Sequence, residues 1–257
     1  MDENNDFIYI NGFKIEIKVI SQNSNLEPII FLHEGLGSVS LWKDFPLKVS
    51  KATNRDVILY SRIGMGKSSP IRKNRKSTYM HDEANIYLPQ IIKSLNLSEV
   101  ILFGHSDGAS IALIYAGSGF KVKSLILEAP HVFVEDISIK GIEYAKKMWY
   151  SNDLKNKLSK YHKDVSGAFN GWCNAWLSKE FRKWNIESYL KNINLPIMLI
   201  QGLNDEYGTL KQLDSIDKNV INKTYRIEIE DCGHSPHSQY PKDIINKIKY
   251  FLSYNLT

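Results

Sequence analysis

The chain carries a serine between two glycines at the point where a buried strand should give way to a helix. Gly104 to Gly108 read G-x-S-x-G, with Ser106 at the centre. The apolar run 100–103 precedes them, and residues 109–116 can form a helix with a broad apolar face. Strand and helix nearly touch at so sharp a turn, which favours residues without side chains on either side of the serine. The pattern predicts a nucleophile elbow. Without its flanks it would be a glycine-rich turn with an incidental serine.

Two downstream residues could activate this serine. A serine hydroxyl is a poor nucleophile at neutral pH and needs a base within hydrogen-bond reach and an acid that orients the base. Asp205 follows the apolar run 196–200, and His234 follows the alternating run 225–229. Alone, Asp205 would be an ordinary turn aspartate and His234 an ordinary surface-loop histidine. Together, in the order Ser, Asp, His, they predict a catalytic triad.

The chain resembles the α/β-hydrolase superfamily over nearly its whole length. The resemblance implies an α/β fold: a mostly parallel twisted sheet covered by helices on both faces, with an inserted helical cap. It also implies hydrolysis of a small or medium carboxylic ester, thioester or lactone through an acyl-enzyme, without a metal or organic cofactor. Besides the elbow, the matching segments are His33–Ser38, Gly64–Ser68, Gly202–Asp205 and Gly233–His234.

A serine nucleophile leaves other activities of this fold open. Carbon–carbon bond hydrolysis, a lyase reaction and acyl transfer can use the same triad. A non-catalytic small-molecule receptor on a hydrolase scaffold can also keep it. These remain the alternatives to ester hydrolysis.

The resemblance also places an oxyanion hole, which needs two preorganised N–H donors. One is the backbone N–H of Asp107, the residue after the nucleophile. The other is assigned to Gly35, in the loop after the run 28–32. Leu36 is the alternative donor, because Glu34 stands where the family usually has glycine and could shift the register.

Two acids beside the nucleophile suggest a substrate preference. If the carboxylate of Glu34 or Asp107 faces the pocket, it would repel an anionic substrate group and favour a neutral or cationic one. Alternatively, Asp107 caps the helix behind Ser106, and Glu34 is salt-bridged or solvated. Arg62 is a plausible partner for either acid.

The predicted elements form one core, residues 1–136 and 196–257. Residues 7–10 and 13–20 read as a hairpin around an Asn-Gly turn. Short apolar runs predict strands of a parallel sheet covered on both faces, at 28–32, 57–60, 100–103 and 124–127. Helices are expected near 41–52, 82–94 and 241–254.

Residues 137–195 are too long for an ordinary connection between strands. They hold four of the five tryptophans, and apolar residues recur at helical spacing in 142–150 and 165–176. The resemblance places a helical cap here. The side chains that we expect to line a substrate pocket are Glu34, Leu36, Trp149, Trp172 and Trp176. The alternative is that the tryptophans pack within the cap itself.

Composition constrains the partners and the compartment. A chain of 257 residues is long enough for one large α/β domain, and no stretch approaches a transmembrane span. The first six residues are acidic and polar, so we expect a cytoplasmic protein. The two cysteines suggest neither a disulfide scaffold nor a zinc site. We expect a small-molecule substrate, no nucleic-acid or membrane partner, and a monomer or homodimer.

Two segments carry patterns that are typical of nucleic-acid or nucleotide binding. The net charge is +5, and residues 72–76 carry four positive charges, which usually form a solvated loop and not a nucleic-acid site. Residues 61–68 approach the phosphate-loop pattern G-x-x-x-x-G-K-[ST], but Ser61 stands in place of its first glycine. They also fit a turn that α/β hydrolases carry after a core strand.

Overall fold

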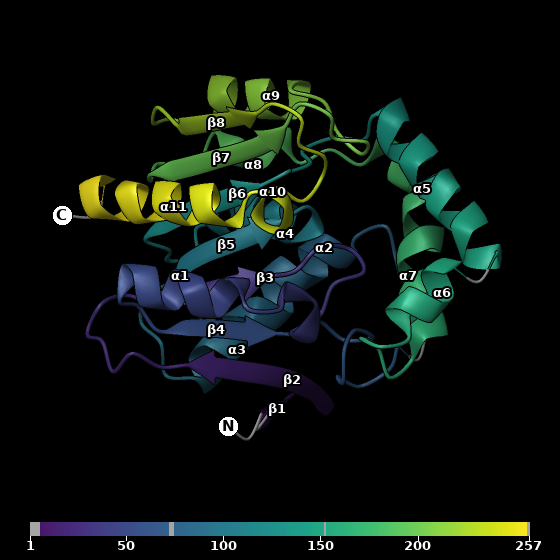
Figure 1. The fold of residues 1–257 in the computed structure, drawn as a ribbon, viewed down its shortest axis with the longest axis horizontal. Helices are drawn as coiled ribbons and strands as arrows, with labels where there is room; N and C mark the ends of the chain where they lie inside the picture. The colour runs from purple at the N-terminus through teal and green to yellow at the C-terminus, as the bar shows by residue number, and fades with distance from the viewer. Residues whose placement is uncertain (1–5, 72–74, 152, 256–257) are drawn as a thin grey trace.

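One sheet forms the centre of the molecule, with helices on both of its faces (Figure 1). Within residues 6–71, 75–151 and 153–255, which the computed structural model describes, eight strands follow the order β1-β2-β4-β3-β5-β6-β7-β8. β1 pairs antiparallel with β2 and β2 with β4, and the other pairings are parallel. The predicted fold class is confirmed. The strands span Asp6–Ile10 (β1), Phe13–Ile20 (β2), Ile29–Leu32 (β3), Val57–Tyr60 (β4), Ile101–His105 (β5), Ser124–Glu128 (β6), Ile197–Gly202 (β7) and Tyr225–Ile229 (β8).

The strands lie where the apolar runs predict them. β4 and β8 have the predicted bounds, and β3 to β7 are buried along their whole length. Helices cover both faces of these strands, which explains why their sequences are continuously apolar. β5 runs two residues beyond its predicted end. This extension pairs His105 with Glu128 of β6 at the carboxyl edge of the sheet.

Helices on the two faces enclose separate parts of the core. On one face α1 and α11 pack together over an apolar cluster that includes Phe31 and Phe103. On the other face lie α3, α4, α8 and α9, and every residue of α4 is buried (Figure 1). These helices span Phe45–Thr53 (α1), Leu88–Ser94 (α3), Asp107–Gly117 (α4), Glu187–Leu190 (α8), Lys211–Asn219 (α9) and Pro241–Asn255 (α11).

Two of the predicted helices depart from regular α-helical geometry. The expected helix 82–94 lies within a continuous helical run, which consists of α2 (Tyr79–Asp82), a π-helical turn (Glu83–Tyr87) and α3. Pro89 cannot donate a backbone hydrogen bond across this junction. The expected helix 41–52 begins as a short 3₁₀ turn. Lys43 then adopts φ 53°, and α1 starts at Phe45 with a proline in its first turn.

The segment between β6 and β7 is mostly helical. Figure 1 shows α5, α6 and α7 beside the carboxyl ends of the parallel strands. The short helix α8 belongs to the same segment but packs on α4 of the core. A cap with bounds 137–195 stays a prediction, and we refer to these residues as the insertion. Its first helices span Asp136–Tyr150 (α5), Asp153–Leu158 (α6) and Val165–Trp176 (α7).

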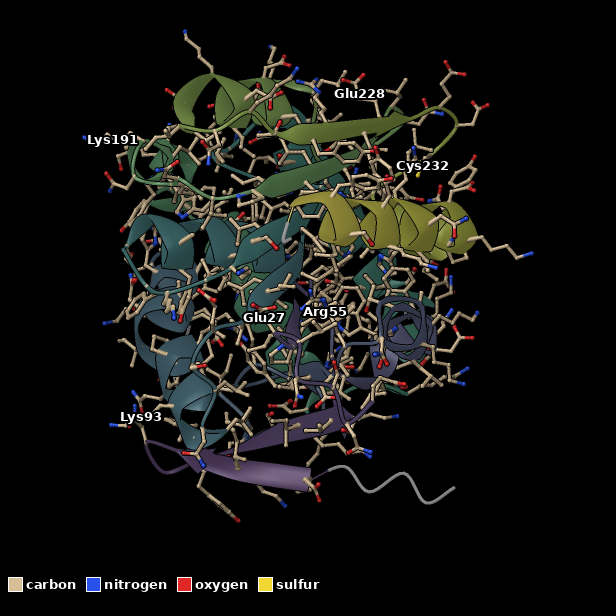
Figure 2. All side chains as sticks on the ribbon, turned by 90° about the vertical axis from the view of Figure 1, so that its left-hand side faces the viewer. Glu27, Arg55, Lys93, Lys191, Glu228 and Cys232 are labelled. Carbon is tan, nitrogen blue, oxygen red and sulfur yellow. The ribbon has the colours of Figure 1, made fainter. Side chains whose placement is uncertain are left out.

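The amino edge of the sheet lies on the opposite side of the molecule. Figure 2 views this side, with Glu27 and Arg55 labelled next to each other. The Arg55 guanidinium donates to the Glu27 carboxylate at 2.9 Å and to the Glu27 backbone carbonyl at 2.8 Å. Lys123 lies 3.4 Å from the same carboxylate. These ion pairs join the segments that enter β3, β4 and β6.

The loop 61–68, whose sequence is close to a phosphate-binding pattern, donates hydrogen bonds to a carboxylate inside the protein. The Ser61 hydroxyl and the Lys67 N–H donate to Glu16 of β2, at 2.7 Å and 2.9 Å. A side chain at Gly66 would collide with that carboxylate. Because these donors are already bound to a buried anion, the structure favours a structural turn over a phosphate loop.

The basic segment is described only in part. Arg72, Lys73 and Asn74 lie outside the described residues. Arg75 turns inward and donates to the carbonyl oxygen of Ile63 at 2.7 Å. The expectation of a solvated loop is therefore wrong for Arg75. None of the described helices has the length and apolar character needed to cross a membrane.

Candidate active site

Ser106 occupies a strained turn between β5 and α4. Its φ of 54° and ψ of −117° lie outside the regions that serine adopts without strain. The Ser106 N–H donates to the carbonyl oxygen of Glu128 at 2.8 Å, which holds the turn. A Cβ atom on Gly104 would lie 2.5 Å from the backbone of α4, and one on Gly108 would collide with the carbonyl oxygen of Leu32. Close backbone approach therefore requires glycine at both positions, as the pattern predicts.

Asp205 and His234 meet in the loops that follow β7 and β8. The Nδ1 atom of His234 lies 2.8 Å from each carboxylate oxygen of Asp205. Asp205 also accepts from the Gln201 side-chain amide at 2.6 Å and from the Tyr207 N–H at 2.7 Å. A carboxylate only accepts hydrogen bonds, so Nδ1 carries the proton and Nε2 is free to act as a base.

The pair shifts both pKa values away from their ordinary positions. Burial alone lowers the pKa of His234, but the charge of Asp205 and its hydrogen bond outweigh burial and raise that pKa above 6.5. Burial alone raises the pKa of Asp205, yet His234 outweighs it and brings that pKa below 3.8. Asp205 is therefore ionised at neutral pH and favours the imidazolium that forms when His234 takes a proton.

A cavity of about 230 Å³ lies beside Ser106 and His234. Apolar side chains of the insertion form one wall: Ile142, Leu154, Leu158, Trp172 and Trp176. The core contributes polar residues to the lining, among them Glu34 and Glu206. Among the described residues, neither a lysine nor an arginine lines this cavity. Its lining thus suits an apolar group next to a neutral or positively charged one.

The structure separates the predicted pocket side chains into two groups. Four of them line the cavity: Glu34, Leu36, Trp172 and Trp176. Trp149 does not. Its ring stacks on Phe169 of α7 with centroids 4.2 Å apart and an interplanar angle of 1°. The expectation for Trp149 is corrected accordingly: it packs α5 against α7 within the insertion.

The loop after β3 presents the two alternative oxyanion donors differently. The Leu36 N–H donates to the Glu34 carboxylate and is occupied. Gly35 lies against the indole of Trp172, so close that a Cβ atom would collide with it. The Nε2 atom of His162, from the insertion, donates to the Leu36 carbonyl oxygen at 2.7 Å. The insertion thus holds this loop in place from two sides.

The Asp107 carboxylate is bound within the protein. It accepts from the Tyr79 hydroxyl at 2.5 Å and from the Trp176 indole N–H at 3.3 Å. The Arg62 guanidinium lies 3.5 Å away, and both charged side chains are buried. The suggested partner Arg62 is therefore present. The helix-cap alternative gains no support, since these partners occupy both carboxylate oxygens.

The cavity lining also includes residues that the sequence patterns do not identify, among them His131, Ser138, Glu206 and Tyr207. The His131 ring lies 5.8 Å from that of His234, and burial lowers the pKa of His131 to about 4, so it is neutral. His131 and Tyr207 follow the ends of β6 and β7. Ligands bind beyond the carboxyl ends of parallel strands, so the position of His131 and Tyr207 after two core strands is the sequence feature that could have identified both residues.

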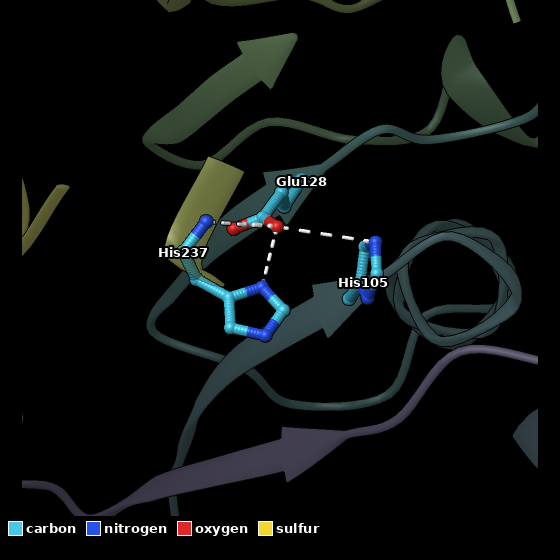
Figure 3. A group of neighbouring side chains, drawn as sticks. All are labelled: His105, Glu128 and His237. Atoms are coloured by element: carbon cyan, nitrogen blue, oxygen red, sulfur yellow. Dashed lines mark hydrogen bonds and ion pairs between the residues drawn. The ribbon is translucent and has the colours of Figure 1, made fainter. Parts of the chain in front are cut away.

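A cluster of polar residues contacts the backbones of Ser106 and His234. Among the described residues, His105, Glu128 and His237 form a group that could hold a metal ion, with ligand atoms within 4.8 Å of one another (Figure 3). They come from β5, β6 and the short helix α10 (Pro236–Gln239).

Comparison with known families identifies the fold. Residues 27–158 match the family model described as alpha/beta hydrolase fold. The chain belongs to this family. This hydrolase is 33% identical to a proline iminopeptidase from Heyndrickxia coagulans over 167 residues, which cover 64% of this chain and 51% of that protein. A proline iminopeptidase from Lactobacillus acidophilus is 21% identical, with 95% of this chain and 96% of that protein covered.

Solved structures share the architecture at low sequence identity. An esterase from Exiguobacterium antarcticum has a TM-score of 0.74 and 18% identity, with 96% of this chain and 98% of that chain covered. An enol-lactonase from Burkholderia xenovorans LB400 has a TM-score of 0.74 and 14% identity, with coverages of 96% and 100%. At this identity the likeness establishes the fold and leaves the substrate open.

Proposed function

We propose that this hydrolase cleaves a small or medium carboxylic ester, thioester or lactone through an acyl-enzyme on Ser106. The observation that carries the proposal is the arrangement of three residues from three loops. His234 is bound to Asp205 at 2.8 Å, and His234 and Ser106 line one cavity. The strained backbone of Ser106 adds support, because such strain clusters at functional sites.

The proposed reaction has two halves. His234 takes the Ser106 hydroxyl proton while Oγ attacks the acyl carbonyl carbon, and Asp205 stabilises the imidazolium. The imidazolium then protonates the leaving group, and the bond between the carbonyl carbon and that group breaks. Water next attacks the acyl-enzyme with His234 again as base, which releases the acid and restores Ser106.

The oxyanion of the tetrahedral intermediate needs two donors near Ser106. We assign the N–H groups of Asp107 and Gly35 to this role. The Leu36 N–H is the alternative, but the Glu34 carboxylate already accepts its hydrogen bond. We therefore assign the second oxyanion donor to the Gly35 N–H and not to the Leu36 N–H.

A second candidate function is removal of an amino-terminal residue from a peptide. Relatives named proline iminopeptidase favour it, as does a cavity lining that includes Glu34 and Glu206 and, among the described residues, no lysine or arginine. A free amine beside the reacting carbonyl would complement these acids. Ester and peptide substrates would use the same acyl-enzyme chemistry.

The test is covalent labelling followed by a substrate panel. A fluorophosphonate probe should label Ser106 in the wild type, and Ser106→Ala should remove both the label and hydrolysis. Ser110→Ala is the matched control, because Ser110 lies in α4 and donates to the carbonyl oxygen of His131. Full labelling of Ser106→Ala, or none of the wild type, would refute the proposal.

The panel separates the two candidate substrates. p-Nitrophenyl esters of neutral short acids are compared with the p-nitroanilides of alanine and proline. Higher kcat/KM on the esters, with a burst of one p-nitrophenol per chain, supports the ester hydrolase. Higher kcat/KM on the anilides supports the peptidase. A labelled protein that turns over neither class points to the alternative reactions of the fold.

A further inference from the structure

Glu128 lies at the junction between the nucleophile and the loop of the catalytic histidine candidate. It ends β6 opposite His105 of β5, and its backbone carbonyl accepts the Ser106 N–H at 2.8 Å. The side chain is fully buried, and Figure 3 shows it reaching toward His237 of α10. His237 follows His234 by three residues. Glu128 thus contacts the Ser106 backbone directly and reaches the loop of His234 through His237.

The Glu128 carboxylate binds the start of α10 through two contacts. Its Oε1 atom accepts from Nδ1 of His237 at 2.6 Å and from the His237 backbone N–H at 3.2 Å. Burial raises the pKa of Glu128, but the charge and hydrogen bond of His237 outweigh burial and bring that pKa below 4.5. The ionised carboxylate therefore fixes both the side chain and the backbone of His237.

His105 supports the same loop from another side. Its Nε2 atom lies 2.7 Å from the backbone carbonyl oxygen of His234 and 3.9 Å from the Glu128 carboxylate. A carbonyl oxygen only accepts, so Nε2 carries the proton. Burial lowers the pKa of His105 to about 3, which keeps the ring neutral. His105 is thus a neutral donor that holds the His234 backbone.

These contacts favour a hydrogen-bonded cluster over a metal centre. A metal ligand offers a lone pair, yet Nδ1 of His237 and Nε2 of His105 both donate to oxygen. A cation bound here would have to displace both hydrogen bonds. It would also release the His234 backbone.

We propose that Glu128 is a positioning residue that sets the place of His234 relative to Ser106, acting through His237, while His105 holds the same loop by its own hydrogen bond. This inference rests on the proposed function of Ser106 and His234. A misplacement of about 1 Å can slow an enzyme by up to about 10²-fold, so a residue that touches no substrate can still control turnover.

The test is Glu128→Gln, which keeps the shape and removes the charge. We expect kcat on a p-nitrophenyl ester, and the rate of fluorophosphonate labelling, to fall by about 10- to 100-fold. KM should change by less than about twofold, because Glu128 does not line the cavity. The acid limb of the kcat/KM pH profile should stay in place. A lower melting temperature with unchanged kcat per labelled site would show a merely structural role and overturn the proposal.

A matched buried acid provides the control. Glu83 is buried and accepts from the Tyr60 hydroxyl at 2.7 Å, away from the cavity lining. Glu83→Gln should lower stability and leave kcat per labelled site unchanged. If it slows turnover as much as Glu128→Gln does, the effect of Glu128 is not specific and the proposal fails.

Variants of His237 keep the test valid if Glu128→Gln does not fold. His237→Asn places an amide N–H near the Nδ1 position and should keep most of kcat, whereas His237→Ala should lose about 10-fold or more. Equal kcat in both variants would overturn the proposal. So would stoichiometric binding of Zn²⁺ that accelerates the wild type and disappears in Glu128→Gln. An unlabelled wild type refutes the proposed function, whereas a labelled wild type with an equally reactive Glu128→Gln refutes this inference alone.

Discussion

Two ion pairs, one at each edge of the sheet, differ in how deeply they are buried. At the carboxyl edge, the Arg62 and Asp107 side chains are only 2% and 1% exposed. At the amino edge, Lys123 and Glu27 are 34% and 28% exposed, while Arg55, which also pairs with Glu27, is only 6% exposed. A buried charge must be matched by partners and hydrogen bonds, whereas a pair in water contributes little. The Arg62–Asp107 pair at the carboxyl edge therefore depends on its partners, whereas the Lys123–Glu27 pair at the amino edge contributes little.

The backbone shows the same contrast. At the amino edge, α1 ends at Asn54 with φ 51° and ψ 39°, a left-handed conformation that asparagine tolerates. At the carboxyl edge, Ser106 combines a positive φ with ψ −117°. That combination costs of order 1–3 kcal/mol and persists only where surrounding contacts enforce it. Strain and buried charge thus coincide at the edge that carries the candidate site.

The largest effect should follow from Asp205→Asn. The imidazole of His234 loses the acceptor that fixes its Nδ1 proton, so kcat should fall by about 10⁴-fold with KM nearly unchanged. Steady-state kinetics on the best ester measures this loss. The carboxylate of the adjacent Glu206 accepts a hydrogen bond from the His234 backbone N–H at 3.3 Å. An inactive Glu206→Gln beside a nearly normal Asp205→Asn would mean that the acid is wrongly assigned.

The pH profile sharpens this assignment. Only neutral His234 can act as a base, and its pKa is raised above 6.5 by Asp205 despite burial. The acid limb of kcat/KM should therefore be centred above pH 6.5 in the wild type and shift to lower pH in Asp205→Asn. A limb that does not move would contradict the role of Asp205.

Arg62→Leu should give the next largest effect, on stability. The guanidinium pairs with Asp107 and donates to the carbonyl oxygens of His33 and Glu34, at 2.7 Å and 2.8 Å. Removing it leaves a buried carboxylate without its counter-charge, which should cost about 3–5 kcal/mol. Urea unfolding measures the change. A loss below about 1 kcal/mol would break the contrast between the two edges.

Glu34→Gln should have a smaller effect, on selectivity. Burial raises the pKa of Glu34 above 4.5, and its side chain lines the cavity. Loss of the charge should lower kcat/KM for an ester with an amine on its acyl side by about 10-fold relative to the neutral isostere, an effect of about 1.4 kcal/mol. Glu99→Gln, paired with Lys121 at 3.7 Å away from the cavity lining, is the control. Equal changes across cationic, neutral and anionic esters would show that Glu34 does not sense substrate charge.

The smallest effect should come from Lys123→Met at the amino edge. Its ammonium pairs with Glu27 at 3.4 Å in a partly exposed position. The free energy of unfolding should change by less than about 1 kcal/mol, and kcat should not change. A larger loss of stability would show that the amino edge also depends on its ion pairs.

Local sequence was sufficient to predict the sheet and the elbow. Runs such as 57–60 are apolar because helices cover both faces of their strands, and that requirement is visible in the sequence itself. The glycines around Ser106 are equally visible, since close backbone approach excludes any side chain. The order of Asp205 and His234 after successive strands placed both at one edge of a parallel sheet, where the structure joins them at 2.8 Å.

Only the tertiary structure decided which direction each side chain takes. Trp149 and Trp172 share a segment and a residue type, yet one stacks on Phe169 and the other lines the cavity. Tyr79 of α2 and Trp176 of α7 bind Asp107 from segments that no local pattern relates to the elbow, whereas the sequence suggested the third partner, Arg62. Periodicity reports which residues are buried, but contacts between distant segments determine what each buried residue touches.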